Sequence, residues 1–169
     1  METITLAGGC FWCTEAIFSQ LKGVDKVTPG YSGGNVKNPS YEEVSSGKTG
    51  HAESVQIVFD PKIISLENLL YVFFKLHDST TLNRQGADGG TQYRSAIFYN
   101  SEEQKLAAEN AKNKVAGSVT EISKYINFFP ADPSHKDYYF KHRLTPYCMF
   151  VIDPKIQKLK MEFKNLIRN

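Results

Sequence analysis

The chain has 169 residues, 41% of them hydrophobic, and can therefore bury a core of its own. Its 20 basic and 18 acidic residues leave a net charge of +2. This excludes a dedicated nucleic-acid binder, because such proteins carry a strong basic excess. No apolar run is long enough to cross a membrane, and residues 1–7 lack the basic start of a secretory signal. We expect one monomeric domain over residues 1–169.

Apolar residues recur at every second position in strands and at every third or fourth position in helices. In chain order these patterns predict a strand over 3–7, a helix over 11–21, strands over 24–28 and 53–59, a helix over 65–77, a strand over 95–99, a helix over 101–117, a strand over 121–126 and a helix from 153 onward. The polar loop over 78–93 is long, and loops of that length inside a domain usually serve function.

Local signals mark the ends of these helices. Gly23 follows the first helix, Ser101 and Gln104 have capping-box spacing, and Asp153-Pro154 supply a cap and a first-turn proline for the last helix. The order strand, helix, strand, strand, helix, strand is that of the ferredoxin-like split β-α-β fold. We therefore predict an α+β protein with a mixed sheet, flanking helices and an added C-terminal helix.

The most informative stretch is Gly9-Cys10-Phe11-Trp12-Cys13. Cys10 follows two glycines at the first turn of a predicted helix, where unpaired N–H groups and the helix dipole favour a thiolate. A thiolate is a nucleophile, so the placement predicts a reactive cysteine. The whole chain has three cysteines, too few for a disulfide scaffold, which indicates a reducing compartment, the cytoplasm.

Two other interpretations of these cysteines exist. A free cysteine such as Cys10 is commonly a small buried hydrophobic residue. Cys10 and Cys13 would also suit half of a zinc site, but zinc takes about four ligands and only Cys148 remains as a third thiol. We therefore expect no metal site.

Several further motifs follow in order along nearly the whole chain. They are Gly8-Gly9-Cys10-Phe11-Trp12, Gly30-Tyr31-Ser32-Gly33-Gly34, Asn38-Pro39-Ser40-Tyr41-Glu42-Glu43-Val44, Ser46-Gly47-Lys48-Thr49-Gly50-His51-Ala52-Glu53, Asp60-Pro61 and Gln85-Gly86-Ala87-Asp88-Gly89-Gly90-Thr91-Gln92-Tyr93-Arg94-Ser95-Ala96-Ile97. With them the sequence resembles the type A peptide methionine sulfoxide reductase family. The resemblance implies thiol-dependent reduction of methionine sulfoxide, of the S epimer, free or in proteins.

The resemblance also implies roles for individual residues. Cys10 would attack the sulfoxide sulfur and Glu53 would protonate the oxygen. Tyr41 and Tyr93 would hydrogen-bond that oxygen, and Asp88 would help to hold the site. Phe11 and Trp12 would enclose the methyl group.

These roles are physically reasonable, because a sulfoxide is polar at its oxygen and apolar at its methyl group. Its oxygen leaves poorly unless it is protonated, so an acid is required. Burial among aromatic rings would raise the pKa of Glu53 and keep it protonated near neutral pH. Without the resemblance, Glu53 would be a surface carboxylate, Tyr41 and Tyr93 packing residues, and Asp88 a turn residue.

Attack by Cys10 would leave a sulfenic acid, which condenses with a second thiol to form a disulfide. Family precedent favours Cys148 as that resolving cysteine, whereas Cys13 forms a Cys-x-x-Cys pair typical of redox proteins. The resemblance implies that thioredoxin then reduces the disulfide and that neither a metal nor an organic cofactor takes part. His51 would position Glu53, and His77-Asp78 would support the site.

Two other functions compete with this one. The first is a general dithiol-disulfide oxidoreductase that uses Cys10 and Cys13 but leaves Glu53 and the tyrosines without a role. The second is a non-catalytic peptide-binding module, in which Phe11, Trp12 and Tyr93 form an aromatic pocket and Cys10 is dispensable.

Overall fold

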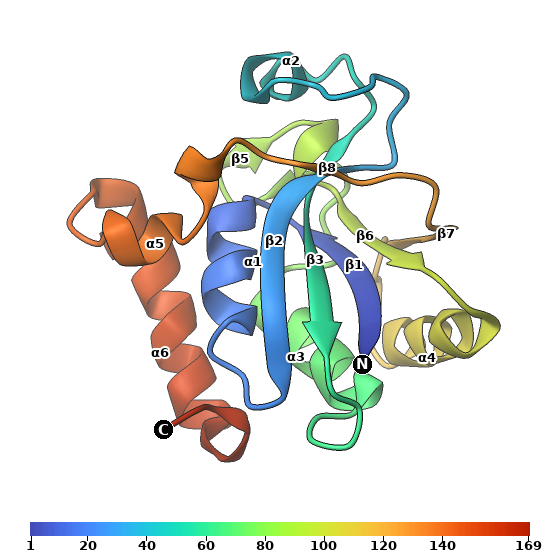
Figure 1. Cartoon of the computed structure of the whole chain (residues 1–169), viewed down its shortest axis with the longest axis vertical. Coiled ribbons are helices and arrows are strands. Elements are labelled where there is room, and N and C mark those ends of the chain that lie inside the picture. Colours follow the sequence, from blue (N-terminus) through green and yellow to red (C-terminus); the bar gives the residue numbers. More distant parts are fainter.

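A six-stranded sheet is the centre of the computed structural model, which describes residues 1–169 (Figure 1). Its strands are β1 (Glu2–Gly8), β2 (Val24–Ser32), β3 (Ala52–Phe59), β6 (Ser95–Tyr99), β7 (Glu121–Lys124) and β8 (Phe129–Pro130). They lie in the order β7-β6-β1-β3-β2-β8, with β6 and β7 parallel and every other neighbouring pair antiparallel. The central order β6-β1-β3-β2 is that of the split β-α-β arrangement. The predicted α+β fold with a mixed sheet is confirmed.

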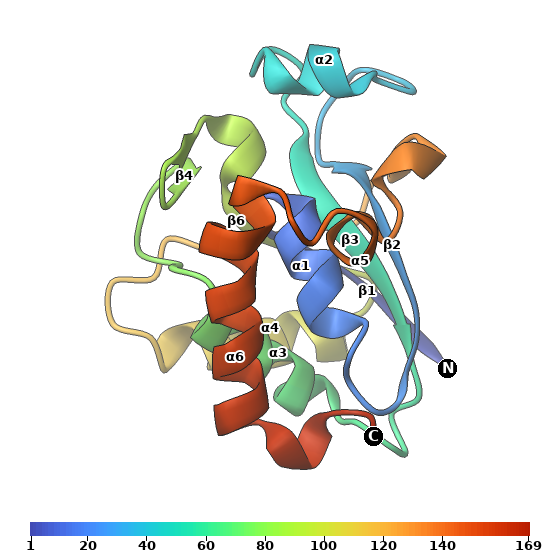
Figure 2. The ribbon, with the colours of Figure 1, turned by 90° about the vertical axis from the view of Figure 1, so that its left-hand side faces the viewer.

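Four long helices lie on one side of this sheet, as the turned view shows (Figure 2). The helices are α1 (Phe11–Phe18), α2 (Tyr41–Ser45), α3 (Leu66–Leu76), α4 (Glu102–Asn113), α5 (Tyr138–Lys141) and α6 (Asp153–Glu162), of which α1, α3, α4 and α6 form that layer. A small hairpin of β4 (Arg84–Gln85) and β5 (Asp88–Gly89) stands apart from the sheet. None of the helices combines the length and apolar character that a membrane crossing requires.

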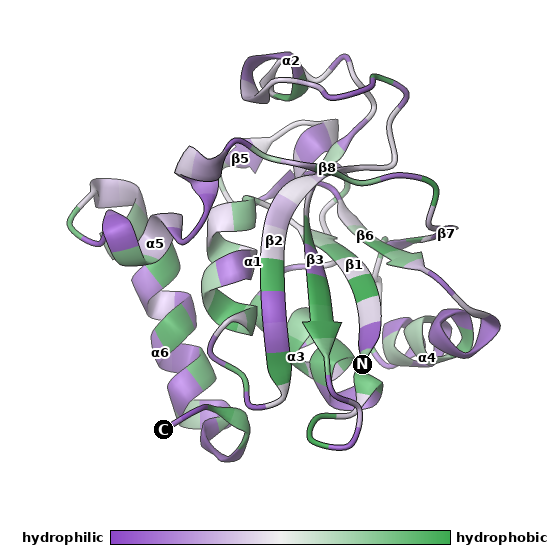
Figure 3. Ribbon diagram, in the orientation of Figure 1, coloured by the Kyte–Doolittle hydropathy of each residue, from purple (hydrophilic) through white to green (hydrophobic).

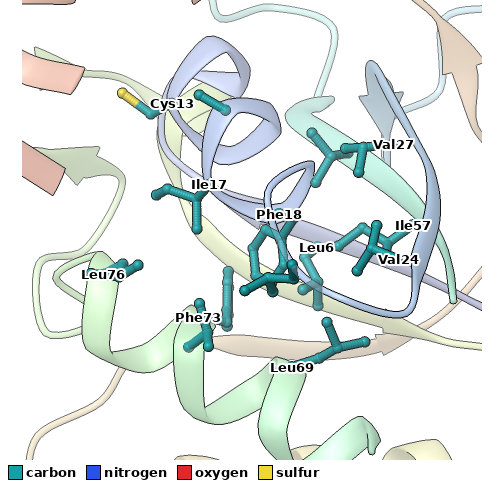
Figure 4. Close-up of a cluster of buried hydrophobic side chains, with 14 of the residues drawn as sticks. Leu6, Cys13, Ile17, Phe18, Val24, Val27, Ile57, Leu69, Phe73 and Leu76 are labelled. Carbon is teal, nitrogen blue, oxygen red and sulfur yellow. The ribbon is translucent and has the colours of Figure 1, made fainter. Parts of the chain in front are cut away.

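The core fills the space between the helices and the sheet. A single cluster of 30 buried residues includes Leu6 on β1, Ile57 on β3, Phe18 on α1, and Leu69 and Phe73 on α3 (Figure 4). The hydropathy colouring shows the same arrangement, with apolar residues gathered along the lower strands and α3 (Figure 3). Because the core fixes these elements against one another, the residues at the upper edge of the sheet are held in defined positions.

Several predicted boundaries differ from the observed ones. α1 stops at Phe18 rather than at residue 21, because Leu21 leaves the helix and forms an isolated bridge with Ile167. β2 runs on to Ser32 rather than to Thr28, because its last residues pair with β3 and β8. α4 and β7 each end earlier than predicted, at Asn113 and Lys124, where intrahelical and ladder hydrogen bonding stops.

Several segments without a predicted element also form secondary structure, among them α2, the loop over 78–93, β8 and α5. The Ser40 side chain accepts a hydrogen bond from the Glu43 N–H, and the Glu43 carboxylate accepts one from the Ser40 N–H. This reciprocal capping box starts α2 and was visible in the sequence as Ser-x-x-Glu. The loop over 78–93 contains the β4–β5 hairpin and a 3-10 turn at Thr91–Tyr93.

The C-terminal helix α6 begins at Asp153, as predicted, but the predicted capping role of Asp153 is wrong. Residues Cys148–Ile152 form one π-helical turn that runs directly into α6, so Asp153 continues a helix and caps none. The Asp153 carboxylate instead accepts a hydrogen bond from the Tyr139 hydroxyl of α5. Asp153 therefore bonds to the Tyr139 side chain instead of to the backbone N–H groups that an N-cap residue would bind.

A buried carboxylate anchors the segment before α5 to α1. Glu15 is 1% exposed, and its oxygens accept hydrogen bonds from the Lys136 ammonium at 2.9 Å and from the Asp137 N–H at 3.0 and 3.1 Å. Burial raises the pKa of Glu15, and these hydrogen bonds lower it. The anchor holds residues 135–138 beside the first turn of α1.

Removal of this anchor tests its contribution to stability. We expect Glu15→Ala to lower the free energy of unfolding by about 1–3 kcal/mol, because the Asp137 N–H is left without a partner. Urea unfolding measures the loss. Glu162→Ala is the matched control, since that exposed carboxylate lies 3.9 Å from Lys158 and is expected to contribute at most about 1 kcal/mol. Equal losses in the two variants would contradict the anchoring role.

Candidate active site

Cys10 lies at the turn where β1 ends and α1 begins. It is the N-cap residue of α1, with φ −58° and ψ 127°, and it is 8% exposed. Gly9 before it has φ 95°, and a Cβ at that position would lie 2.7 Å from the Gln85 side chain. Only glycine combines this backbone conformation with the close approach of the β4–β5 hairpin. The predicted position of Cys10 at the helix start is confirmed.

Glu53 takes a place on β3 that a core residue would otherwise fill. It alternates with Val55 and Ile57 on the face covered by the helices, and it is 1% exposed. Its Oε1 atom accepts a hydrogen bond of 3.1 Å from the Phe11 N–H, at the start of α1, whereas Oε2 has no partner. Burial raises the pKa of Glu53 to about 8, with a smaller contribution from the negative charge of Asp88. The carboxyl group is therefore protonated at neutral pH.

The charge of Glu53 acts on the hydroxyl groups of Tyr41 and Tyr93. Tyr41 begins α2, and its pKa is raised to about 12 by burial and then by the neighbouring Glu53 and Cys10. Tyr93 ends the 3-10 turn, and burial followed by Glu53 raises its pKa as well. Both hydroxyls keep their protons and are hydrogen-bond donors beside Cys10 and Glu53.

Asp88 joins the site through a residue from the C-terminal part of the chain. Its Oδ2 atom accepts a hydrogen bond of 2.8 Å from the Tyr147 hydroxyl. The same hydroxyl lies 3.9 Å from the Cys13 sulfur, and its presence lowers the pKa of the Cys10 thiol. Asp88 therefore fixes the Tyr147 hydroxyl beside the Cys-x-x-Cys pair.

Aromatic rings form the apolar wall of the site. Trp12 stacks on Tyr138 with ring centroids 3.7 Å apart, and its Nε1–H donates to Nδ1 of His135 at 3.1 Å. The His135 ring also packs against Phe11 at 5.3 Å and against Tyr41 at 4.7 Å. The predicted pair Phe11 and Trp12 is thus completed by residues that lie more than 120 positions further along the chain.

The electrostatic environment of Cys10 differs from the prediction. Burial, followed by Glu53 and Cys13, raises the pKa of the Cys10 thiol well above its usual value. The Trp12 N–H and the Tyr147 hydroxyl lower the pKa but do not compensate. The expected thiolate is therefore wrong for the resting protein, because the loss of hydration outweighs the effect of the helix start.

All three cysteines are free and buried. The charge of Cys13 raises the pKa of the Cys10 thiol, and the charge of Cys148 raises the pKa of the Cys13 thiol. Cys148 is fully buried in the π-helical turn that precedes α6. No group of three or more His, Cys, Asp or Glu side chains is arranged to hold a metal ion.

Two histidines support the loops around the site. His51 accepts a hydrogen bond of 3.0 Å from the Gly34 N–H and bonds to the Val36 carbonyl at 2.7 Å, which ties the β2–α2 loop to the start of β3. His77 lies 2.8 Å from the Ser95 hydroxyl, beneath the turn after β1. Burial lowers the pKa of His77 to about 4, so its ring is neutral. Both histidines are structural neighbours of the site.

Sequence reasoning did not single out four residues of this site, Tyr31, His135, Tyr138 and Tyr147. Tyr31 lies inside the motif Gly30-Tyr31-Ser32-Gly33-Gly34, and Tyr147 directly precedes Cys148, so the sequence did contain a signal for those two residues. His135 and Tyr138 lie in a segment without periodicity, and only the fold brings them to Trp12.

Comparison with known proteins gives consistent results. Residues 2–167 match the family model described as peptide methionine sulfoxide reductase. Peptide methionine sulfoxide reductase MsrA of Sulfolobus acidocaldarius is 54% identical over 168 residues, which cover 96% of each chain.

Solved structures agree with this result. Methionine sulfoxide reductase A of Corynebacterium diphtheriae superposes with a TM-score of 0.78 at 32% identity, covering 85% of this chain and 76% of that one. Mxr1 from Saccharomyces cerevisiae, in complex with Trx2, matches with a TM-score of 0.52 at 26% identity, covering 81% of this chain and 84% of that one. The chain therefore belongs to the peptide methionine sulfoxide reductase family.

Proposed function

We propose that this enzyme reduces the S epimer of methionine sulfoxide, free or in proteins, with Cys10 as nucleophile and Glu53 as proton donor. The observation that carries the proposal is the buried, protonated Glu53 carboxyl group, held by the Phe11 N–H beside Cys10. A carboxyl group with a pKa of about 8 is an acid suited to neutral pH.

The reaction begins when the Cys10 thiol releases its proton and the sulfur attacks the sulfoxide sulfur. Glu53 donates a proton to the oxygen, which Tyr41 and Tyr93 hold by hydrogen bonds. The hydroxyl then passes to the Cys10 sulfur as the bond between the two sulfurs breaks. The products are a sulfenic acid on Cys10, which is oxidised, and methionine, which is reduced.

The aromatic wall provides the place for the substrate methyl group. The wall consists of the fully buried Phe11 and the partly buried Trp12, and both His135 and Tyr138 stack on the Trp12 ring. A sulfoxide bound there has its methyl group against rings and its oxygen toward hydroxyl donors, which matches its two chemical ends. Asp88 contributes by holding Tyr147.

The local geometry favours Cys13 as the first thiol to resolve the sulfenic acid. The Cys13 N–H donates a 3.1 Å hydrogen bond to the Cys10 carbonyl, as in a tight turn whose first and fourth Cα atoms lie within about 7 Å. A disulfide requires Cα atoms within that range. The sulfenic acid and the Cys13 thiol then condense to a disulfide and water. In this proposal Cys148, whose charge acts on the Cys13 thiol, accepts the disulfide next by exchange.

A thioredoxin closes the cycle in this proposal. Yeast Mxr1, a structural relative, has been solved in complex with Trx2. Two electrons from such a dithiol restore the protein thiols, and no metal or organic cofactor is needed. Because thiols persist in reducing compartments, we place the enzyme in the cytoplasm. One buried cluster, which extends from Ile4 to Phe163, supports a single catalytic domain over residues 1–169.

Replacement of the proton donor tests the acid assignment. We expect Glu53→Gln to slow the formation of methionine by roughly 10²–10⁴-fold, which is the usual contribution of a general acid. Activity of the wild type should fall as the pH rises through about 8, where Glu53 loses its proton. Glu103→Gln, an exposed substitution on α4, is the control. Full activity of Glu53→Gln with dithiothreitol would disprove the assignment.

The order of disulfide formation tests the resolving step. One turnover with methionine sulfoxide in the absence of reductant, quenched early with an alkylating agent, should yield a Cys10–Cys13 disulfide by mass spectrometry. Cys148→Ser should still form it, whereas Cys13→Ser should accumulate sulfenic acid. If a Cys10–Cys148 disulfide forms first while Cys13 is alkylated, Cys148 is the direct resolving residue.

A further inference from the structure

A lysine without a carboxylate partner lies in the first turn of α6. Lys155 is partly buried, next to Ile156, which is 4% exposed. None of the ion pairs of the protein includes Lys155. Because lysine side chains that are withdrawn from water are normally paired, an ion pair does not explain the position of this one.

Lys155 and Cys13 line the same small cavity, which lies between α1, α3 and α6. Its volume is about 10 Å³, so it holds one water at most. Figure 4 shows the Cys13 sulfur turned away from Phe18, and Figure 2 shows α6 packed alongside α1. Most of the remaining wall is apolar and consists of Ile17, Phe18, Phe73 and Leu76. With so little water between them, the charge of the ammonium group acts on the sulfur with little screening.

The charge of Lys155 influences both titratable neighbours in this cavity, Cys13 and His77. Burial raises the pKa of the Cys13 thiol, and the positive charge of Lys155 is the strongest influence that lowers it. The same charge contributes to the lowered pKa of His77, after the larger effect of burial. The ammonium group is therefore directed at the wall of the cavity that Cys13 forms, and it favours the charged form of the thiol.

The resolving step proposed above requires a thiolate at Cys13. Its sulfur attacks the sulfur of the Cys10 sulfenic acid, an S–S bond forms and the S–O bond breaks. The hydroxide leaves with the proton of the Cys13 thiol as water. Cys13 is oxidised and the Cys10 sulfur is reduced, so no further reagent is consumed. A buried thiol loses its proton at neutral pH only with help, and a nearby cation is one such help.

We propose that Lys155 is a positioning residue for this step, in which its ammonium group stabilises the Cys13 thiolate that attacks Cys10. The inference rests on the proposed function, because it assumes that Cys13 resolves the sulfenic acid. Lys155 acts on the second thiol of the pair, whereas the charges that act on Cys10 are those of Glu53 and Cys13. The reduction of the sulfoxide itself does not depend on Lys155.

The other groups that face the Cys13 thiol carry no positive charge. These groups are Cys10 before α1, His77 after α3, Asp88 on β5, and Tyr147 and Cys148 before α6. The Tyr147 hydroxyl lowers the pKa of Cys13, whereas the charges of Asp88 and Cys148 raise it. His77 is neutral, because its pKa is about 4. Lys155 is therefore the one cation that supports a thiolate at this position.

A titration of Cys13 tests the inference without any turnover. In a chain with Cys10→Ser and Cys148→Ser, Cys13 is the only thiol, and the ultraviolet absorbance of its thiolate is followed as the pH rises. The same chain with Cys13→Ser supplies the baseline. We expect Lys155→Met to raise the midpoint by roughly one pH unit, because the thiolate loses a nearby cation. Lys160→Met is the matched control, since this exposed lysine of α6 lies outside the cavity.

Single-turnover kinetics test the consequence for the reaction. With methionine sulfoxide and no reductant, methionine and the Cys10–Cys13 disulfide are measured over time. We expect Lys155→Met to form methionine at the wild-type rate and the disulfide roughly threefold more slowly at neutral pH, because a smaller thiolate fraction is partly offset by higher nucleophilicity. At high pH the two disulfide rates should converge. Lys155→Arg keeps the charge and should restore the wild-type profile.

Either an unchanged midpoint or an unchanged disulfide rate in Lys155→Met overturns the inference. A loss that is equal at every pH and that Lys155→Arg does not restore would also overturn it, since a merely structural role gives that result. Lys155→Gln covers the case in which Lys155→Met does not fold, and the same outcomes decide. A wild-type chain that forms no methionine would refute the proposed function, whereas the titration of Cys13 tests Lys155 independently of that result.

Discussion

The hydrogen bond from the Phe11 N–H to Glu53 is the interaction on which the site depends. It joins the start of α1 to the start of β3, two elements that are 42 residues apart in sequence. The helix start presents its N–H groups there, so a carboxyl group can be buried without losing all its partners. Because only one oxygen is satisfied, the group stays neutral and keeps a proton available. The same bond holds that proton beside Cys10.

Burial of this site has opposite consequences for its two reacting groups. It keeps Glu53 protonated, as an acid requires, but it also keeps Cys10 protonated, although a nucleophile must lose its proton. The helix start and Tyr147 partly compensate at the sulfur. The proposed reaction therefore requires that both protons move, one from the Cys10 thiol and one from the Glu53 carboxyl group.

Local sequence patterns were sufficient for the main strands and helices and for the placement of Cys10, because strand alternation and helix starts are short-range features. Glu53 was singled out only by the resemblance to the family, since its local pattern favours a surface carboxylate. They could not locate His135 or Tyr138, since contacts across more than 120 residues leave no periodicity. They placed the start of the last helix correctly but gave Asp153 a wrong role, because its carboxylate bonds to Tyr139 of another helix and caps no backbone N–H. The protonation of Cys10 depended on burial, which no short motif encodes.

The C-terminal segment connects the chemistry of the site with its recycling. Glu15 anchors that segment to α1, and Tyr138 and His135 then cover Trp12. Cys148 is fully buried in the π-helical turn that leads into α6, whereas Cys13 lies one turn from Cys10 at the start of α1. The proposed order, in which Cys10 pairs with Cys13 before Cys148 takes part, follows from this difference in packing.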